Sequence, residues 1–290
     1  MSPRTGWRSW HLHTSNLDPT TGDEVVRRVV GPAIDRLHDE APGTAWFYLR
    51  YWQGGPHIRL RLAGVGDEPA ARVERQLRCD LAAVTASIPT TLTPDAYLRH
   101  AAPLAAAGEA GRAIDIGELR SPGVYDRRYE PEFDRYGGAP LLAVSESLFA
   151  VSSQLSLAFL RRHPSEAARS GLGLQATRAA LSVVGDDERR RGFCRRAGAG
   201  WQAWAARADA TTTMGKFPPP LSPRHAEVAI PTPVRQWVDH LAAAMDRWRR
   251  GIGEENAQRI LYSHIHLLHN RLGLGVGHEF RHYQTLAVAS

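Results

Sequence analysis

The sequence predicts an α+β fold in a single compact domain that spans residues 1–290. Two observations lead to this prediction. Alternating bulky and polar residues, which indicate β-strands, occur near the N-terminus, whereas helical periodicity dominates from Leu141 onward. No stretch with the composition of a flexible linker separates the two parts. We therefore expect antiparallel β-hairpin and sheet elements with helices, followed by a largely helical C-terminal half.

The N-terminal elements are expected to alternate between strand and helix. Apolar residues at helical spacing follow Asp23, and Pro42-Gly43 breaks that helix. The turn residues Gln53-Gly54-Gly55-Pro56 separate two strand-like runs and so predict a hairpin. The expected elements are strands at 7–13, 46–52 and 57–62, and helices from Asp23 to Pro42 and from Glu68 to Ser87.

The segment 111–140 is rich in Gly, Pro, Tyr and charged residues and is expected to form an ordered loop that carries function. Beyond it the apolar spacing predicts helices, with a break at Phe217–Pro220 and a short segment at Ala226–Ile230. Gly275 and Gly277 are expected to unwind the end of the last helix. The expected helices are 141–162, 165–183, 187–207, 232–250 and 254–273.

Composition excludes several classes of protein. Two cysteines are too few for a disulfide framework or a structural zinc site. No apolar run reaches the length of a membrane span, and the N-terminus lacks a signal-peptide core, which predicts a cytosolic protein. The net charge is +6 and Lys216 is the only lysine, so almost every cation is an arginine. Because no nucleic-acid-binding motif is present, an acidic peptide or a carboxylate-bearing substrate is the expected partner.

The second strand of the hairpin carries the first candidate site. His57, Arg59 and Arg61 occupy alternate positions, so their side chains are expected on one face of the sheet. Three cationic or cationisable groups side by side repel one another unless an anion lies among them. The face is therefore either a surface that binds carboxylates or the solvated side of an edge strand.

The segment 125–138 carries the second candidate site, with three tyrosines, four acids and three arginines in fourteen positions. If a helical turn begins at Pro131, Glu132 and Arg135 lie three residues apart and pair on one face, next to Tyr136. Such a pair holds a guanidinium in a fixed direction for a substrate. The alternative is a surface loop held by its own salt bridges.

The last predicted helix carries the third candidate site, with three histidines in six positions. Its polar side chains form either a proton-transfer site or a set of hydrogen-bonded core residues. The H-x-H-x-x-H spacing lacks the histidine pair four residues apart, with a helical glutamate, that metalloproteases use, so no metal is expected. The buried stripe is expected to be Leu261, Ile265, Leu268 and Leu272, and the neighbouring polar face Tyr262, His266, His269 and Asn270.

Four motifs occur in order along the chain. They are W-x-x-x-H from Trp7, F-Y-x-R-Y-x-x-G-G-P-H-x-R-x-R from Phe47, Y-x-P-E-x-x-R-Y-G-G from Tyr129 and S-x-x-H-x-x-x-N-R-L-G from Ser263. The residues of these motifs and their order resemble those of the thiopeptide-type bacteriocin biosynthesis family, which is the C-terminal elimination-type domain of lantibiotic dehydratases. The resemblance spans nearly the whole chain, from Trp7 to Tyr283.

This resemblance implies an enzyme that modifies ribosomally made peptides. In full-length dehydratases a large N-terminal region glutamylates Ser or Thr, and the C-terminal domain then eliminates glutamate to leave a dehydroamino acid. The chain has no counterpart of the large region, so it is not expected to glutamylate by itself. By motif position, the matching family residues are the strand arginines Arg59 and Arg61, the pair Glu132 and Arg135, and the helix histidine His266.

Two enzymatic activities are consistent with this resemblance, and the alternative from another class is a leader-binding module that only presents the substrate to a partner enzyme. The favoured one is that of a pyridine synthase, which joins two dehydroalanines by a formal [4+2] aza-cycloaddition with loss of water and of the leader peptide. The alternative is a stand-alone elimination protein. In both, the expected partners are a precursor peptide with an acidic leader and other enzymes of the same pathway, and no cofactor is required. The expected catalytic residues are His266, Tyr262, Glu132, Arg135 and Tyr136, and the expected substrate-binding residues are His57, Arg59, Arg61, Tyr51, Trp52, His269 and Asn270.

Overall fold

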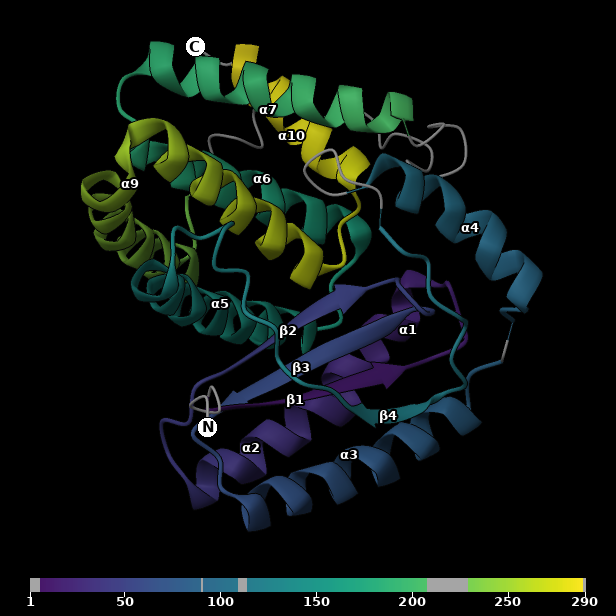
Figure 1. The fold of residues 1–290 in the computed structure, drawn as a ribbon. Coiled ribbons are helices and arrows are strands. Elements are labelled where there is room, and N and C mark those ends of the chain that lie inside the picture. Colours follow the sequence, from purple (N-terminus) through teal and green to yellow (C-terminus); the bar gives the residue numbers. More distant parts are fainter. Residues whose placement is uncertain (1–5, 90, 109–113, 208–228, 289–290) are drawn as a thin grey trace.

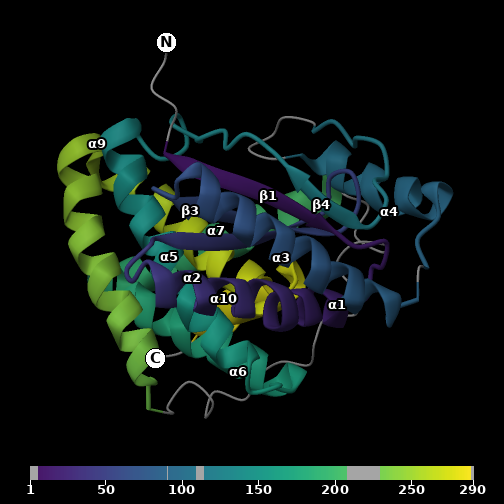
Figure 2. The ribbon, with the colours of Figure 1, turned by 90° about the horizontal axis from the view of Figure 1, so that it is seen from below.

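The computed structural model of the chain describes residues 6–89, 91–108, 114–207 and 229–288. Its architecture is α+β, as the sequence predicts. A four-stranded sheet lies between two helical layers (Figures 1 and 2). Helices from the N-terminal third pack on one face of the sheet, and the C-terminal helices pack on the other. The sheet face that points towards the C-terminal helices is therefore covered by the helical half of the molecule.

The sheet is antiparallel and has the order β2-β3-β1-β4. Because β3 lies between β2 and β1, the alternative of an edge strand for His57, Arg59 and Arg61 is wrong. The strand β4 lies within the segment that the sequence predicts as a loop. The strands are β1 (Trp7–His13), β2 (Trp46–Tyr51), β3 (His57–Ala63) and β4 (Gly123–Asp126).

The first helical layer consists of α1 (Pro19–Val25), a π-helical turn η1 (Val26–Val30), α2 (Gly31–Glu40) and α3 (Asp67–Ala86). The predicted start at Asp23 is wrong, because the Asp18 side chain accepts a hydrogen bond from the Thr20 backbone N–H and caps the helix earlier. Asp23 is instead a buried carboxylate that pairs with Arg50 and Arg169, at 2.6 and 2.7 Å.

The remaining helices are α4 (Pro94–Ala107), α5 (Ala139–Leu160), α6 (Glu166–Ala180), a 3₁₀ turn η2 (Leu181–Val183), α7 (Asp187–Arg207), α9 (Thr232–Leu272) and α10 (Val276–Val288). Gly253 interrupts α9 with φ 80°, where the sequence places a boundary between two helices. Gly277 lies inside α10, so the expectation that it unwinds a helix is wrong. Neither α4 nor α10 was expected. The break at Phe217–Pro220 and most of Ala226–Ile230 lie outside the described residues.

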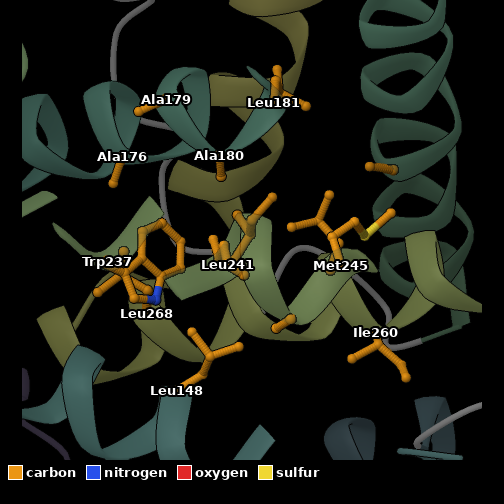
Figure 3. Packing of buried hydrophobic residues seen from close by; sticks show 14 of the residues in the cluster. Leu148, Ala176, Ala179, Ala180, Leu181, Trp237, Leu241, Met245, Ile260 and Leu268 are labelled. Carbon is orange, nitrogen blue, oxygen red and sulfur yellow. The ribbon is translucent and has the colours of Figure 1, made fainter. Parts of the chain in front are cut away.

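Two apolar cores hold the layers together. One lies between the sheet and α1–α3 and includes Trp10, Trp46 and Leu60. The other fills the helical half, where Trp237 and Leu241 of α9 meet the small residues of α6 (Figure 3). Complete burial of such side chains stabilises the fold by about 1.5–3 kcal/mol each.

Helix α5 is, among the described residues, the one helix long and apolar enough to cross a membrane by length and composition. More than half of its most apolar window, 56%, is buried inside the protein. It packs against α9 and β2. Its apolar character is therefore accounted for by its place in the core.

Candidate active site

The C-terminal part of α9 separates buried from accessible side chains. The predicted stripe of Leu261, Ile265, Leu268 and Leu272 is buried, as the spacing indicates. Gly273 then ends the helix with φ 73°, in the left-handed region that favours glycine. The chain reverses into α10, which runs beside α7 and α6 (Figure 1). This reversal brings α10 side chains against the polar face of α9.

His266 forms the central contact of this face. Its Nδ1 lies 2.9 Å from Oε2 of Glu279, whose side chain is buried, whereas the histidine side chain is 28% exposed. Burial alone raises the pKa of Glu279, but charge and hydrogen bonds from His266 and His269 outweigh it and hold that pKa below its usual value. The carboxylate is therefore ionised and accepts the Nδ1–H of His266. This leaves Nε2 as the ring nitrogen that is available to a substrate.

Tyr262 lies one helical turn before His266. Its ring is 5.9 Å from that of Trp201, which is also 5.1 Å from the imidazole of His266. Burial and the negative charge of Glu279 raise the pKa of Tyr262 well above its usual value. The phenol therefore keeps its proton and acts as a hydrogen-bond donor.

His269, predicted as a substrate-binding residue, lies in the interior. Its Nε2 is 3.1 Å from Oγ1 of Thr177 and 3.2 Å from the carbonyl oxygen of Gly173, and its Nδ1 is 3.5 Å from Glu279. Only 1% of the residue is exposed. His269 therefore lies against the same Oε2 of Glu279 that His266 contacts, and it is not placed to touch a substrate.

Glu132 and Arg135 pair as the sequence predicts, at 3.1 Å, in the turn that follows Pro131. Arg135 Nε also donates to Oγ of Ser263, at 3.3 Å, which fixes the guanidinium over α9. Tyr136, expected among the catalytic residues, points into the core and packs edge-on against Phe149, at 5.4 Å between ring centroids. Its burial excludes direct contact with a substrate in this arrangement.

Arg61, on strand β3 of the sheet, places a buried positive charge near the Glu132–Arg135 pair. Its guanidinium lies 4.5 Å from the ring centroid of Tyr129 and 5.2 Å from that of Phe47, and the residue is only 9% exposed. Burial lowers the pKa of Arg61 to about 10, while the nearby Tyr129, Glu132 and Glu146 act in the opposite direction. Arg61 Nε has no hydrogen-bond partner among the described residues. A buried donor of this kind is suited to an anionic group of a ligand.

The other predicted binding residues lie elsewhere. Tyr51, Trp52 and His57 lie towards the other end of the hairpin from Arg61. Arg59, two positions from Arg61 on the same strand face, stacks on Tyr51 at 3.4 Å. Asn270 binds the fold itself: its side chain accepts from the Arg50 N–H at 2.9 Å and donates to the Arg50 carbonyl at 3.0 Å. Asn270 therefore joins α9 to β2.

Four residues of the site were not among the sequence candidates: Glu279, Ser263, Trp201 and Tyr129. Ser263 and Tyr129 belong to the motifs quoted above, so those motifs could have identified them as site residues. Glu279 was not found because the sequence predicts an unwound chain where α10 begins. A surface hollow of about 390 Å³ between η2 and the start of α9 contains none of these residues.

The site thus combines a histidine–carboxylate pair, a protonated phenol and two arginines on an α+β fold. The family of the lantibiotic biosynthesis dehydratase C-terminal domain matches residues 7–289, and the chain belongs to it. This is a family of peptide-antibiotic biosynthesis. No curated protein matches the chain in sequence.

Solved structures share this fold. The chain is similar to a pyridine synthase, TbtD, from thiomuracin biosynthesis, with 20% identity, coverage of 98% and 97% of the two chains and a TM-score of 0.67. It is also similar to TsrL, with 16% identity, 98% and 93% coverage and a TM-score of 0.62. A third similar structure is the tRNA-dependent lantibiotic dehydratase MibB from Microbispora sp. 107891, with 17% identity and a TM-score of 0.55. There the match covers the whole of this chain but 28% of the dehydratase.

Proposed function

We propose that the protein is a pyridine synthase of thiopeptide maturation. Its substrate is a precursor peptide that bears azoles and two dehydroalanines. The amide at one dehydroalanine tautomerises to a 2-azadiene, which adds to the alkene of the other. Loss of water, and then of the leader peptide as an amide, makes the new six-membered ring an aromatic pyridine and closes the macrocycle. The end-to-end similarity to a pyridine synthase fold supports this proposal.

The observation that carries the proposal is the His266–Glu279 pair at 2.9 Å. Tautomerisation and both eliminations each need a proton removed from one atom and delivered to another. Nε2 of His266 is oriented by the bond at Nδ1 and is the acceptor for such a proton. The imidazolium of His266 then returns the proton to the second atom, and Tyr262, whose raised pKa keeps it protonated, serves as a hydrogen-bond donor to the peptide. The imidazolium that forms is stabilised by the buried carboxylate.

Arg61 and Arg135 supply positive charge in this account. As the amide tautomerises, negative charge develops on its oxygen, and a buried guanidinium stabilises that charge more than water does. Arg135 is held by Glu132 and Ser263, and Arg61 by the two aromatic rings beneath it. Holding two alkenes of one long peptide in contact supplies about 7–11 kcal/mol of the barrier. The chemistry requires no cofactor.

The second candidate function is elimination of glutamate from a glutamylated Ser or Thr. The same two arginines favour it, since a planar guanidinium binds the carboxylates of a glutamyl group well. His266 is then the base that removes the Cα proton. The match to part of a lantibiotic dehydratase supports this candidate at the level of the fold.

We place the protein in the cytosol with other enzymes of the same pathway, where the ribosomal precursor is made. Its leader is acidic in this proposal, and the basic protein, with a net charge of +6, attracts it electrostatically. An arginine-lined surface outside the reaction pocket is expected to capture the leader. Charge provides orientation there, and apolar leader residues fix the register.

Mass spectrometry of a synthetic peptide tests the proposal. The peptide carries an acidic leader, azoles and two dehydroalanines in its core. We expect release of the leader as an amide together with a pyridine-containing macrocycle. Unchanged peptide that still binds the protein tightly indicates a binding module and contradicts the proposal.

A further inference from the structure

Glu146, on α5, has a half-buried carboxyl group that the proposed mechanism does not use. Its Oε1 accepts a hydrogen bond of 2.7 Å from the hydroxyl group of Tyr129, in the segment between β4 and α5. The side chain of Trp7, at the start of β1, also hydrogen-bonds to Glu146, and its ring lies edge-on to Tyr129 with 5.8 Å between centroids. The carboxyl group is therefore held in place from the sheet and from the segment before α5.

Glu146 borders the candidate active site from the side of α5. The guanidinium of Arg61 lies 4.5 Å from the ring centroid of Tyr129, and the charges of both Glu132 and Glu146 act on it. Glu132 in turn pairs with Arg135, which is fixed over α9. Glu146 is therefore next to the arginines of the site, while the histidine–carboxylate pair lies on α9 and α10.

The carboxyl groups of Glu146 and Glu279 differ in the direction of their pKa shifts. Burial raises the pKa of Glu146, and the hydrogen bonds from Tyr129 and Trp7 offset part of that rise. Among the acids of the described residues whose pKa departs from its usual value, Glu146 is the one with a raised pKa, and Glu279 is one of those with a lowered pKa. Two acids with opposite shifts are typical of sites in which one stays ionised and the other donates a proton.

Tyr129 determines which oxygen of Glu146 carries that proton. Burial and the hydrogen bond to Glu146 raise the pKa of Tyr129 well above its usual value, so the phenol keeps its proton and donates it to Oε1. A proton on the carboxyl group therefore lies on Oε2. In this form Glu146 is a neutral acid with one O–H to donate, and the phenol fixes its direction.

Loss of the leader peptide is the step of the proposed reaction that most requires such an acid. The leader leaves through an amide nitrogen, which is a poor leaving group as an anion and gains a proton as the C–N bond breaks. The hydroxyl group lost as water is bound to a carbon next to a ring nitrogen, whose lone pair assists its departure. In the alternative reaction, glutamate leaves as a stable carboxylate and requires no proton.

We propose that Glu146 is a second catalytic residue, which donates the proton on Oε2 to the leaving amide nitrogen of the leader. The inference rests on the proposed function for the identity of the leaving group. The electron pair of the C–N bond stays with the nitrogen, which takes the proton of Glu146. His266 removes the proton from the adjacent ring carbon, and the electron pair of that C–H bond forms the last double bond of the pyridine. Water then reprotonates the carboxylate of Glu146, because the side chain is only half-buried.

Mass spectrometry over the course of the reaction tests the proposal, with the leader-bearing peptide that contains azoles and two dehydroalanines. We expect Glu146→Gln to form the ring and to lose water, but to release the leader amide about 10²–10⁴-fold more slowly than the wild type. A leader-bearing intermediate that lacks one water is therefore expected to accumulate. The amide oxygen of the glutamine still accepts the hydrogen bond from Tyr129, so the variant is expected to fold, and its melting temperature checks this.

Two further variants sharpen the test. Tyr129→Phe is expected to slow release of the leader by less than Glu146→Gln does, because the acid remains and only its orientation is lost. The matched control is Glu130→Gln, which changes an exposed acid next to Tyr129 and is expected to release the leader at the wild-type rate.

The outcomes separate this inference from the proposed function. A ring from the wild type, together with leader release at the wild-type rate by folded Glu146→Gln, overturns the inference and leaves the function standing. Loss of ring formation itself in folded Glu146→Gln also overturns it, because the residue then acts before the leader leaves. Failure of the wild type to form any ring contradicts the proposed function, and the inference falls with it.

Discussion

The two layers that enclose the site contribute different chemistry. The sheet layer presents Arg61, a fixed positive charge whose Nε has no hydrogen-bond partner among the described residues. The helical layer presents His266 with the buried acid Glu279, so it provides a proton that moves. In the proposed function, substrate binding and proton transfer are therefore assigned to separate halves of the fold. Substitutions in the two layers are therefore expected to give different kinetic signatures.

The strongest test of this division is His266→Ala. We expect turnover to fall by about 10²–10⁴-fold, because the proton acceptor is lost. The fold is expected to remain intact, since Ile265 and Leu268 carry the packing of this part of α9. His240→Ala, which removes an exposed histidine of the same helix, is the matched control. Near-normal turnover of His266→Ala indicates that another group transfers the proton.

Arg61→Gln tests the sheet layer. Loss of a buried charge donor is expected to lower kcat by about 10²–10³-fold. The pH dependence of kcat is expected to stay as in the wild type, because the helical pair is untouched. Arg61→Lys is expected to recover only part of the rate, since a point charge does not reproduce the guanidinium fork. A changed pH profile in Arg61→Gln contradicts the division between layers.

Glu279→Gln tests how the helical layer orients its histidine. The amide is expected to donate to Nδ1 of His266, which places the imidazole proton on Nε2 and removes the acceptor from the substrate side. We expect kcat to fall by about 10²-fold while leader affinity is unchanged. Recovery of activity by Glu279→Asp supports this positioning role. Equal loss of leader affinity and of kcat argues instead for a structural role.

Leader capture is expected to be electrostatic and therefore sensitive to salt. Raising the salt concentration from 0.15 M to about 1 M shortens the Debye length from about 8 Å to about 3 Å. The Kd of a labelled leader is therefore expected to rise several-fold, as measured by anisotropy. The turnover of peptide already bound is expected to change little. A Kd that does not respond to salt excludes capture by the arginines.

Acid is expected to destabilise the protein through the sheet layer. The unfolded chain protonates His11 and His13 below pH 6.5, whereas the folded chain resists protonation until about pH 3. Stability is therefore greatest above pH 6.5 and falls as the pH is lowered from 6.5 towards 3. Urea unfolding at pH 7.5 and 5.5 measures this loss. The loss of stability between these two pH values is expected to be smaller in His11→Gln. An equal loss in that variant assigns the pH dependence to other titratable groups.

The sequence predicted the sheet side of the site better than the helical side. Strict alternation placed His57, Arg59 and Arg61 on one face, and the three-residue spacing placed Glu132 with Arg135. The partner of His266 was missed because Gly275 and Gly277 suggested an unwound chain, whereas Gly273 alone ends α9 and Val276 begins a new helix. The stacking of His11 and His13 of β1 on His57 of β3 was missed because these strands pair across more than forty residues, and sequence spacing does not report such register.

Burial also separated residues that the helical spacing had grouped. Tyr262, His266, His269 and Asn270 share one side of α9, but the packing of α6 encloses His269, and the edge of β2 engages Asn270. Periodicity identifies the face of a helix, and only tertiary packing decides which part of that face remains open.

The most direct test of the central claim is one mass spectrum of a mixed reaction. Wild-type protein is incubated with equal amounts of a leader-bearing peptide that contains two dehydroalanines and of a peptide that carries a glutamylated serine. The account predicts a pyridine macrocycle and a free leader amide from the first peptide, with the second unchanged, and no product with His266→Ala. Release of glutamate from the second peptide, with the first unchanged, contradicts it and identifies the protein as an elimination enzyme.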